Sequence, residues 1–362
     1  MAKNKKNIKK NHDKASWHSS LNHRQWRRSR NKQNVGVSKV EKARRAYEIQ
    51  MFGSFTKVIA PKSFNLITNT DEVLSFIEKL DKLFQLHKDT YVKLRHVKEI
   101  SEDAIVLLLS KALEFKDSKI NINGNKPLDN NVLAKIEKSG FFKILYDDKH
   151  DPGFEKKNDS YIVRADKTMY THGTKSVDSE LTDGLIGDAA EHIWNTRRRC
   201  RGVQRIFLEL MQNTNNHASR HPGEKFWWIN VARLNGPKRI AFSFIDYGMG
   251  IFQSLETKGT DNKWYGWVNK IIGKCDPNNH PELLRLMMEG KFHQTVTGKP
   301  YRGKGIPGIY NEIQKNSITK LYIISNDAFA DALGAKYVKL EHQLKGTFVH
   351  FEIDASCKNL KW

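Results

Sequence analysis

The segment KRIAFSFIDYGMGI, residues 238–251, joins a strand pattern to a glycine turn in a way that few folds accept. Apolar side chains alternate over 240–244, which is typical of a half-buried β-strand. The strand ends in Asp246, followed by Gly248 and Gly250. Glycines at this spacing let the backbone turn sharply and approach a flat ligand closely. Because a carboxylate accepts hydrogen bonds from exocyclic amines such as that of adenine, the segment predicts a base-binding site at the end of a strand.

A helix predicted over 201–221 carries a polar face. Its apolar residues can pack on a sheet, whereas Glu209, Asn213 and His217 recur every four residues and so lie along one side. A solvent-exposed helix also has a polar face. The polar face therefore indicates a functional site only together with the neighbouring sequence motifs.

A glycine-rich segment, YRGKGIPGI at 301–309, leads into another predicted helix. Such turns offer unpaired N–H groups and the positive end of the helix dipole to phosphates. Arg302 and Lys304 add full positive charges. The glycines of the segment are Gly303, Gly305 and Gly308. Because the segment does not follow a strand, as a dinucleotide-binding fingerprint does, it predicts by itself only an anion site.

Gly346 and Thr347 stand at the start of the last alternating segment, 345–353. In this order, the four features resemble the N-box, the two glycine boxes and the terminal Gly-Thr of the GHKL superfamily. That superfamily includes gyrase, MutL, sensor histidine kinases and anti-sigma-factor kinases. The resemblance covers about residues 180–354 and implies a Bergerat-fold α/β sandwich with a mixed, mainly antiparallel sheet that binds ATP and Mg²⁺.

The resemblance also implies a role for each matching residue. Glu209 is the catalytic candidate, which would orient or deprotonate an attacking water. Asn213 would be the Mg²⁺ ligand, since a hard cation prefers oxygen ligands. Asp246 would bind the adenine amino group, with Thr347 in the water network beside it. The other implied nucleotide-binding residues are Gly248 and Gly250 at the base, and Arg302, Gly303, Lys304, Gly305 and Gly308 at the phosphates.

The long segment 252–301 between these motifs matches the mobile ATP lid of the family. It contains Trp264, Trp267 and a helix-like stretch over 281–292. We therefore expect the lid to be partly folded.

Residues 51–150 predict a small α/β domain. Strand and helix patterns alternate here, at 90–97, 102–115, 119–125 and 130–145. The layout is similar to a STAS domain, the module of anti-sigma-factor antagonists, over about residues 54–148. The phosphorylated turn of that family would fall at 100–104, where Ser101 is the one hydroxyl. An unrelated α/β scaffold domain fits the same pattern.

Residues 151–180 are polar, with scattered turn formers and some strand character at 161–163. We expect them to connect the first domain to an ATP-binding domain over 181–357. The expected fold class is thus α/β (α+β), with a STAS-like domain followed by a Bergerat-fold sandwich.

The positive charge of the chain is concentrated at its N-terminus. The formal net charge is +22, and residues 1–45 hold 15 lysines and arginines against only Asp13 and Glu41. We expect residues 1–50 to form a flexible basic tail. Trp17 and Trp26 lie among arginines, which would suit base stacking and phosphate contacts. A tail that binds nucleic acid and a tail that is merely solvated both fit this composition.

The composition excludes several other classes. Three widely spaced cysteines offer neither a disulfide framework nor a paired metal motif. No apolar stretch approaches the roughly 18 residues of a membrane span, and no apolar segment of a secretory signal follows the first lysines. We therefore expect a cytoplasmic protein.

Three functions remain open. The first is an ATPase switch whose nucleotide state is communicated to a protein partner or nucleic acid, in bacterial regulation or phage defence. The second is a serine/threonine protein kinase like the anti-sigma-factor kinases. The third is a non-hydrolysing, nucleotide-sensing adaptor for nucleic acid. A homodimer is compatible with each, whereas a sensor histidine kinase is disfavoured because none of the 14 histidines lies in a typical phosphoacceptor sequence.

Overall fold

The computed structural model describes residues 39–146, 154–157, 160–165, 169–174, 177–217, 227–234, 236–252, 276, 278–289 and 305–357. The chain divides into two compact units between Phe55 and Thr56. The described part of the first unit contains the helix α2 (Lys39–Phe52). Residues 39–50, predicted as part of a flexible tail, thus belong to a helix, and Arg44–Glu48 and Arg45–Glu41 ion pairs at 3.1 and 3.4 Å span its successive turns.

The second unit begins with an α/β layer built on a parallel sheet. Its strands, in the order β1-β3-β5, are β1 (Thr56–Ile59), β3 (Thr90–Lys93) and β5 (Ile122–Asn125). A shorter parallel pair joins β2 (Ser63–Phe64) to β4 (Glu99–Ile100). The helices are α3 (Thr70–Gln85), α4 (Glu102–Asp117), α5 (Asn130–Lys138) and α6 (Phe141–Tyr146). The predicted alternation of strands and helices is confirmed.

The prediction of a single helix over 130–145 was wrong, because the structure has two helices there. Asp129 caps the first, α5, by accepting hydrogen bonds from the N–H groups of Asn131 and Val132. Gly140 then adopts a positive φ of 78°, a conformation that commonly ends a helix. The chain resumes as α6.

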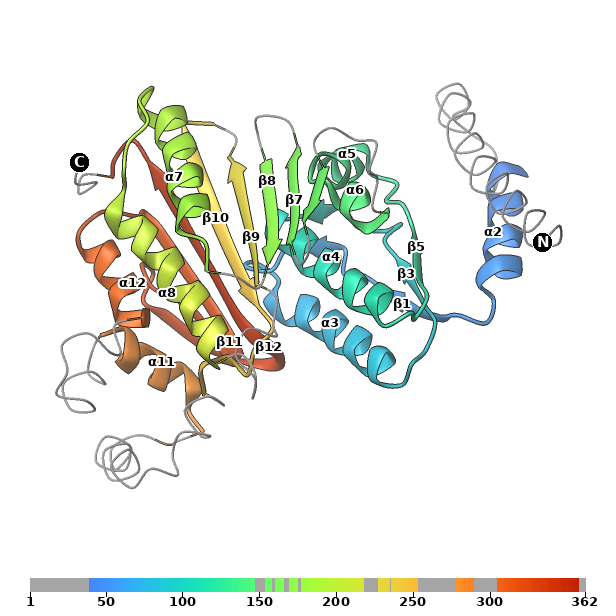
Figure 1. Ribbon diagram of the computed structural model, residues 1–362. Helices are drawn as coiled ribbons and strands as arrows, with labels where there is room; N and C mark the ends of the chain where they lie inside the picture. The colour runs from blue at the N-terminus through green and yellow to red at the C-terminus, as the bar shows by residue number, and fades with distance from the viewer. Residues whose placement is uncertain are drawn as a thin grey trace. The chain divides into compact units, whose positions relative to one another are not determined.

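A seven-stranded sheet follows, with the order β11-β12-β10-β9-β8-β7-β6 (Figure 1). Its strands are β6 (Phe154–Lys157), β7 (Ser160–Ala165), β8 (Met169–Thr174), β9 (Trp227–Arg233), β10 (Arg239–Asp246), β11 (Lys320–Asp331) and β12 (Lys336–Asp354). All pairings among these strands are antiparallel, where the resemblance implied a mixed sheet. The segment 151–180, expected to be a connection, supplies three of the strands.

Within the described part of the chain, four helices cover one face of this sheet (Figure 1). They are α7 (Ser179–Trp194), α8 (Arg201–His217), α11 (His280–Met288) and α12 (Gly305–Gln314). Their apolar residues share a core with alternate residues of β10, among them Phe242 and Phe244. The antiparallel sheet and its helices, together with the parallel N-terminal layer, confirm the α/β fold class.

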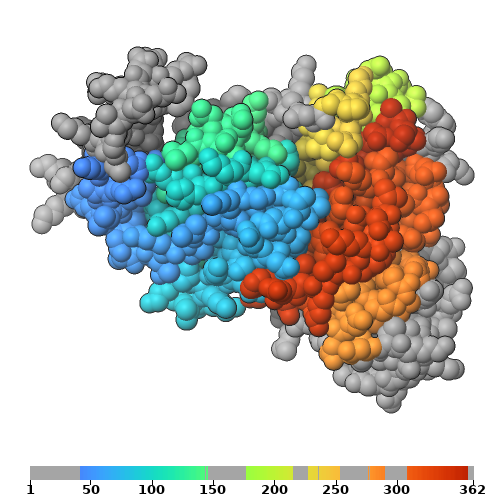
Figure 2. All heavy atoms as spheres, turned by 180° about the vertical axis from the view of Figure 1, so that it is seen from behind, coloured from blue at the N-terminus to red at the C-terminus, as the bar shows by residue number. Residues whose placement is uncertain are grey.

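The other face of the sheet packs on the N-terminal α/β layer. Ile245 of β10 and Phe348 of β12 belong to the same core as Leu74 of α3 and Leu108 of α4. Figure 2 shows the N-terminal layer in blue directly beside the red strands β11 and β12. The segments that the sequence divided into two domains therefore share one core, and the central strands are buried on both sides.

No helix in the described part of the chain is long and apolar enough to cross a membrane.

Three aromatic rings form the centre of the core between the sheet and α8. The ring of Phe351 stacks on that of Phe242, with 5.1 Å between the ring centroids, and its centroid lies 5.2 Å from that of Phe207. All three side chains are fully buried. We expect Phe351→Ala to lower the free energy of unfolding by about 3–5 kcal/mol, because it leaves a cavity beside two rings. Urea denaturation followed by circular dichroism measures the loss. Leu333→Ala, at a side chain that is 61% exposed, is the control and should change little. Similar losses in both variants would contradict this assignment of the core.

Candidate functional site

Asp246, the predicted base-binding residue, lies at the end of β10 beside Thr347 of β12. The two residues are register partners in the antiparallel pairing. Asp246 is 7% exposed, and its Oδ1 accepts a hydrogen bond from the N–H of Gly248 at 2.8 Å. Burial raises the pKa of Asp246 to about 6, although hydrogen bonds from Gly248 and Thr347 act in the opposite direction. The structure thus brings together three of the predicted residues around a buried carboxyl group.

Two glycines allow the backbone to close around this carboxyl group. Gly346 has a φ of 131°, and a Cβ there would overlap the carbonyl oxygen of Asp246. Gly250 has a φ of 75°, and a Cβ there would overlap the side-chain amide of Asn326. Both positions therefore require glycine for two reasons, the backbone conformation and the close contact.

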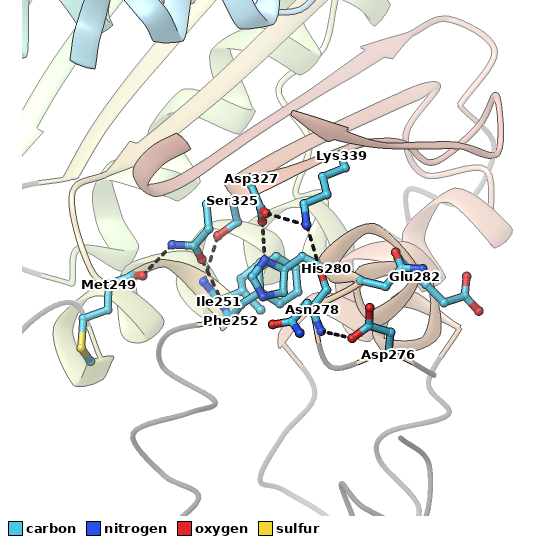
Figure 3. Close-up of polar contacts among 12 residues, drawn as sticks. Met249, Ile251, Phe252, Asp276, Asn278, His280, Glu282, Ser325, Asp327 and Lys339 are labelled. Atoms are coloured by element: carbon cyan, nitrogen blue, oxygen red, sulfur yellow. Dashed lines mark hydrogen bonds and ion pairs between the residues drawn. The ribbon is translucent and has the colours of Figure 1, made fainter. Parts of the chain in front are cut away.

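Two residues of β11 that the sequence analysis missed hold the glycine turn in place (Figure 3). Ser325 Oγ accepts a hydrogen bond from Ile251 N at 2.9 Å and donates one to Gly346 O at 3.1 Å. Asn326 donates from Nδ2 to Met249 O at 3.0 Å, and its Oδ1 accepts from Phe252 N at 3.2 Å.

These contacts depend on a break in strand pairing. The pairing of β11 with β12 shifts register on both sides of Asn326, which turns consecutive polar side chains toward the glycine turn. The signal in the sequence was the polar triplet Ser325-Asn326-Asp327, which interrupts an otherwise apolar strand.

The helices α8 and α12 lie side by side and antiparallel. A Cβ on Gly202 would overlap the carboxylate of Glu312, so the start of α8 touches the end of α12. Further along α8, Arg205 Nη2 lies 3.9 Å from where a Cβ of Gly308 would stand. The two helices therefore run in opposite directions. Helix periodicity places Glu209, one turn beyond Arg205, next to the N-terminal end of α12.

This arrangement puts a carboxylate and an amide beside a helix N-terminus. Glu209 is 26% exposed, and its Oε1 lies 3.6 Å from Nη2 of Arg205. Asn213 is half-buried one turn further along the same side of α8. The free N–H groups of the first turn of α12, which begins at Gly305, attract anions. Arg205 is a cation near this end that the sequence analysis did not identify.

Several predicted residues are not placed together or fall outside the description. Among the described residues, no hydrogen bond or ion pair connects Asp246 to Glu209 or Asn213. Arg302, Gly303 and Lys304 lie outside the described residues, as does much of the predicted lid. The described part of the chain also contains no cluster of three or more histidine, cysteine or acidic side chains that could hold a metal.

The described part of the predicted lid is anchored to the same strand. Helix α11 begins at His280, whose ring stacks on Phe252 at 4.3 Å with an interplanar angle of 3°. His280 Nδ1 also contacts the carboxylate of Asp327, and Lys339 Nζ donates to Asn278 O at 3.2 Å (Figure 3). The bulge of β11 therefore contacts both the glycine turn and the start of α11.

No protein-family model matches the chain, and no curated protein matches it either.

The two reasons for glycine at position 346 can be separated by experiment. Gly236 has a positive φ of 97° with no atom near a Cβ position, whereas Gly346 combines positive φ with an overlap against Asp246. We expect Gly236→Ala to cost only backbone strain, about 1–2 kcal/mol of unfolding free energy. Gly346→Ala should lower the free energy of unfolding clearly more, because β10 and β12 must also move apart. Chemical denaturation of both variants measures the difference, and equal losses would show that the close approach has no energetic weight.

Proposed function

We propose that this chain binds Mg-ATP in a GHKL-type site and acts as an ATPase switch. The observation that carries the proposal is the buried carboxyl group of Asp246, with the glycine turn on one side and Gly346-Thr347 on the other. Among the described residues, no cation pairs with Asp246. A buried carboxyl group without a cation costs free energy, and such groups are concentrated at functional sites. An adenine amino group would supply a further donor to this carboxyl group.

The phosphates are assigned to the other end of the proposed site. The N-terminus of α12, with Arg205 nearby, offers N–H groups and positive charge to them. Glu209 lies beside this end on α8 and would activate the attacking water by accepting its proton. Asn213 would complete the coordination of Mg²⁺ together with phosphate oxygens and water, which suits a cation that stays partly hydrated.

One contact favours the switch over an anti-sigma-type kinase that modifies its own N-terminal half. Ser101, the hydroxyl at the turn where a STAS domain would be phosphorylated, is 8% exposed. Its Oγ accepts a hydrogen bond from Leu66 N at 3.4 Å. A hydroxyl buried in this way is a poor phosphoacceptor. We further propose a cytoplasmic regulator whose nucleotide state is communicated to a protein partner, or to nucleic acid bound by the basic N-terminal segment.

Removing the charge of Asp246 should weaken adenine recognition. We expect Asp246→Asn to lower the affinity for ATP with Mg²⁺ by about 10-fold to 100-fold, the value of one hydrogen bond to a charged group. Asp331→Asn is the matched control, because Asp331 also accepts a backbone N–H, at Gly334, but in a distant hairpin. Isothermal titration calorimetry measures both.

The pH dependence of binding tests the same residue. Because the carboxyl group is the stronger acceptor when ionised, ATP affinity of the unmodified protein should fall as the pH drops below about 6, where Asp246 takes up a proton. The Asn variant should lack this step. An affinity that is independent of pH between 5 and 7, on the order of one unit either side of that pKa, would remove Asp246 from the base site.

Glu209 should matter for turnover and not for binding. We expect Glu209→Gln to reduce release of phosphate by about 10²-fold to 10⁴-fold with ATP affinity retained, because it removes a general base. Incubation with γ-labelled ATP measures this: free phosphate indicates an ATPase, labelled protein a kinase, and neither a sensor. Glu180→Gln, on the exposed start of α7, is the control. Full activity in Glu209→Gln would assign the base to another residue.

A further inference from the structure

A buried lysine lies in the N-terminal layer. Lys111 is in the middle of α4, and its side chain is 6% exposed. Its Nζ lies 2.8 Å from the carboxylate of Asp81 on α3 and 3.1 Å from that of Glu114. Burial lowers the pKa of Lys111, but Asp81, Tyr247 and Glu114 together raise it more, so the ammonium group stays charged. A buried charge needs such partners, and removing one of them is costly.

Lys111 also contacts the glycine turn of the proposed base site. Its Nζ lies 4.5 Å from the centroid of the Tyr247 ring, which is the geometry of a cation–π contact. The hydroxyl of Tyr247 forms a hydrogen bond with Ser110 Oγ and donates another to Leu107 O at 3.4 Å. Tyr247 lies between Asp246 and Gly248 in the sequence. One side of the turn is therefore held by α4.

The carboxylate of Asp81 also contacts the second strand of the proposed base site. Lys345 Nζ lies 3.4 Å from Asp81 Oδ2, and Lys345 directly precedes Gly346 and Thr347. Asp81 is thus linked through Lys111 to the turn after Asp246, and through Lys345 to the start of the Gly-Thr segment. These links join residues that lie far apart in the sequence, on both strands that carry the base site.

We propose that Lys111 and Asp81 are positioning residues for the adenine end of the nucleotide site. This inference rests on the proposed ATP-binding function. The N-terminal layer is then part of the nucleotide site, and it acts through Tyr247 and Lys345 without touching the ligand. The phosphate end, at α8 and α12, lies on the opposite face of the sheet and has no contact with this pair among the described residues.

The test compares ATP with inorganic tripolyphosphate, which lacks the base, both with Mg²⁺ and the full chain. We expect Lys111→Met and Tyr247→Leu each to weaken ATP binding by about tenfold, the value of one lost charged contact. Affinity for tripolyphosphate should stay unchanged. In turnover, KM for ATP should rise while kcat at saturating ATP is retained. The matched control is Lys79→Met, which removes an exposed lysine from α3.

Two further variants keep the test decisive if Lys111→Met does not fold. Tyr247→Phe removes only the hydroxyl, and Lys345→Met removes a side chain that is 58% exposed, so both leave the Lys111–Asp81 pair intact. Each should weaken ATP binding and leave tripolyphosphate binding unchanged. Unchanged ATP affinity in these variants, or equal loss of both ligands, overturns the positioning role while the proposed function stands. If the unmodified protein fails to bind ATP, the proposed function fails, and the inference with it.

Discussion

The burial of β10 and β12 on both faces is the constraint on which the rest of the structure depends. One face packs on α7, α8, α11 and α12, and the other on the N-terminal α/β layer. A residue at the end of such a strand has little access to water, which is why the carboxyl group of Asp246 is buried and its pKa is raised. The same two layers place α8 and α12 on one side of the sheet and the Lys111–Asp81 pair on the other.

Polar side chains of β10, β11 and β12 pair with one another across the sheet. Ser243 of β10 and Tyr322 of β11 flank His350 of β12 in one row across the strands. Ser243 Oγ lies 2.9 Å from His350 Nδ1, and the carboxylate of Glu352 lies 3.5 Å from His350 Nε2. Burial alone would raise the pKa of Glu352, but His350 and the nearby Lys320 and Arg239 lower it. Since buried polar groups are costly unless paired, a shift in the register of these strands would lose these contacts.

The sequence predicted local elements well and their partners poorly. Alternation predicted β10 correctly, and apolar content predicted α4, because these patterns report which side of an element is buried. They do not report what covers it. The alternating segment at 345–353 is only part of a longer strand, β12, which runs through Gly346 at positive φ. The pairing of α8 with α12 arises from contacts between distant segments, so no local pattern could predict it.

The same limit explains why Lys111 was missed. In the sequence, Lys111 is one more lysine on a predicted helix. Its proposed role follows only from its contacts with Asp81 and Tyr247 and from the burial of α4. Its position also affects the choice among functions. A kinase substrate domain must present its hydroxyl to a second active site, whereas this layer buries Ser101 and contributes side chains to the support of the proposed base site. Under the proposed ATP-binding function, an N-terminal layer fixed in this way is better suited to controlling nucleotide affinity than to accepting a phosphate, because any ligand that shifts α3 against α4 would act on Tyr247 and Lys345 together.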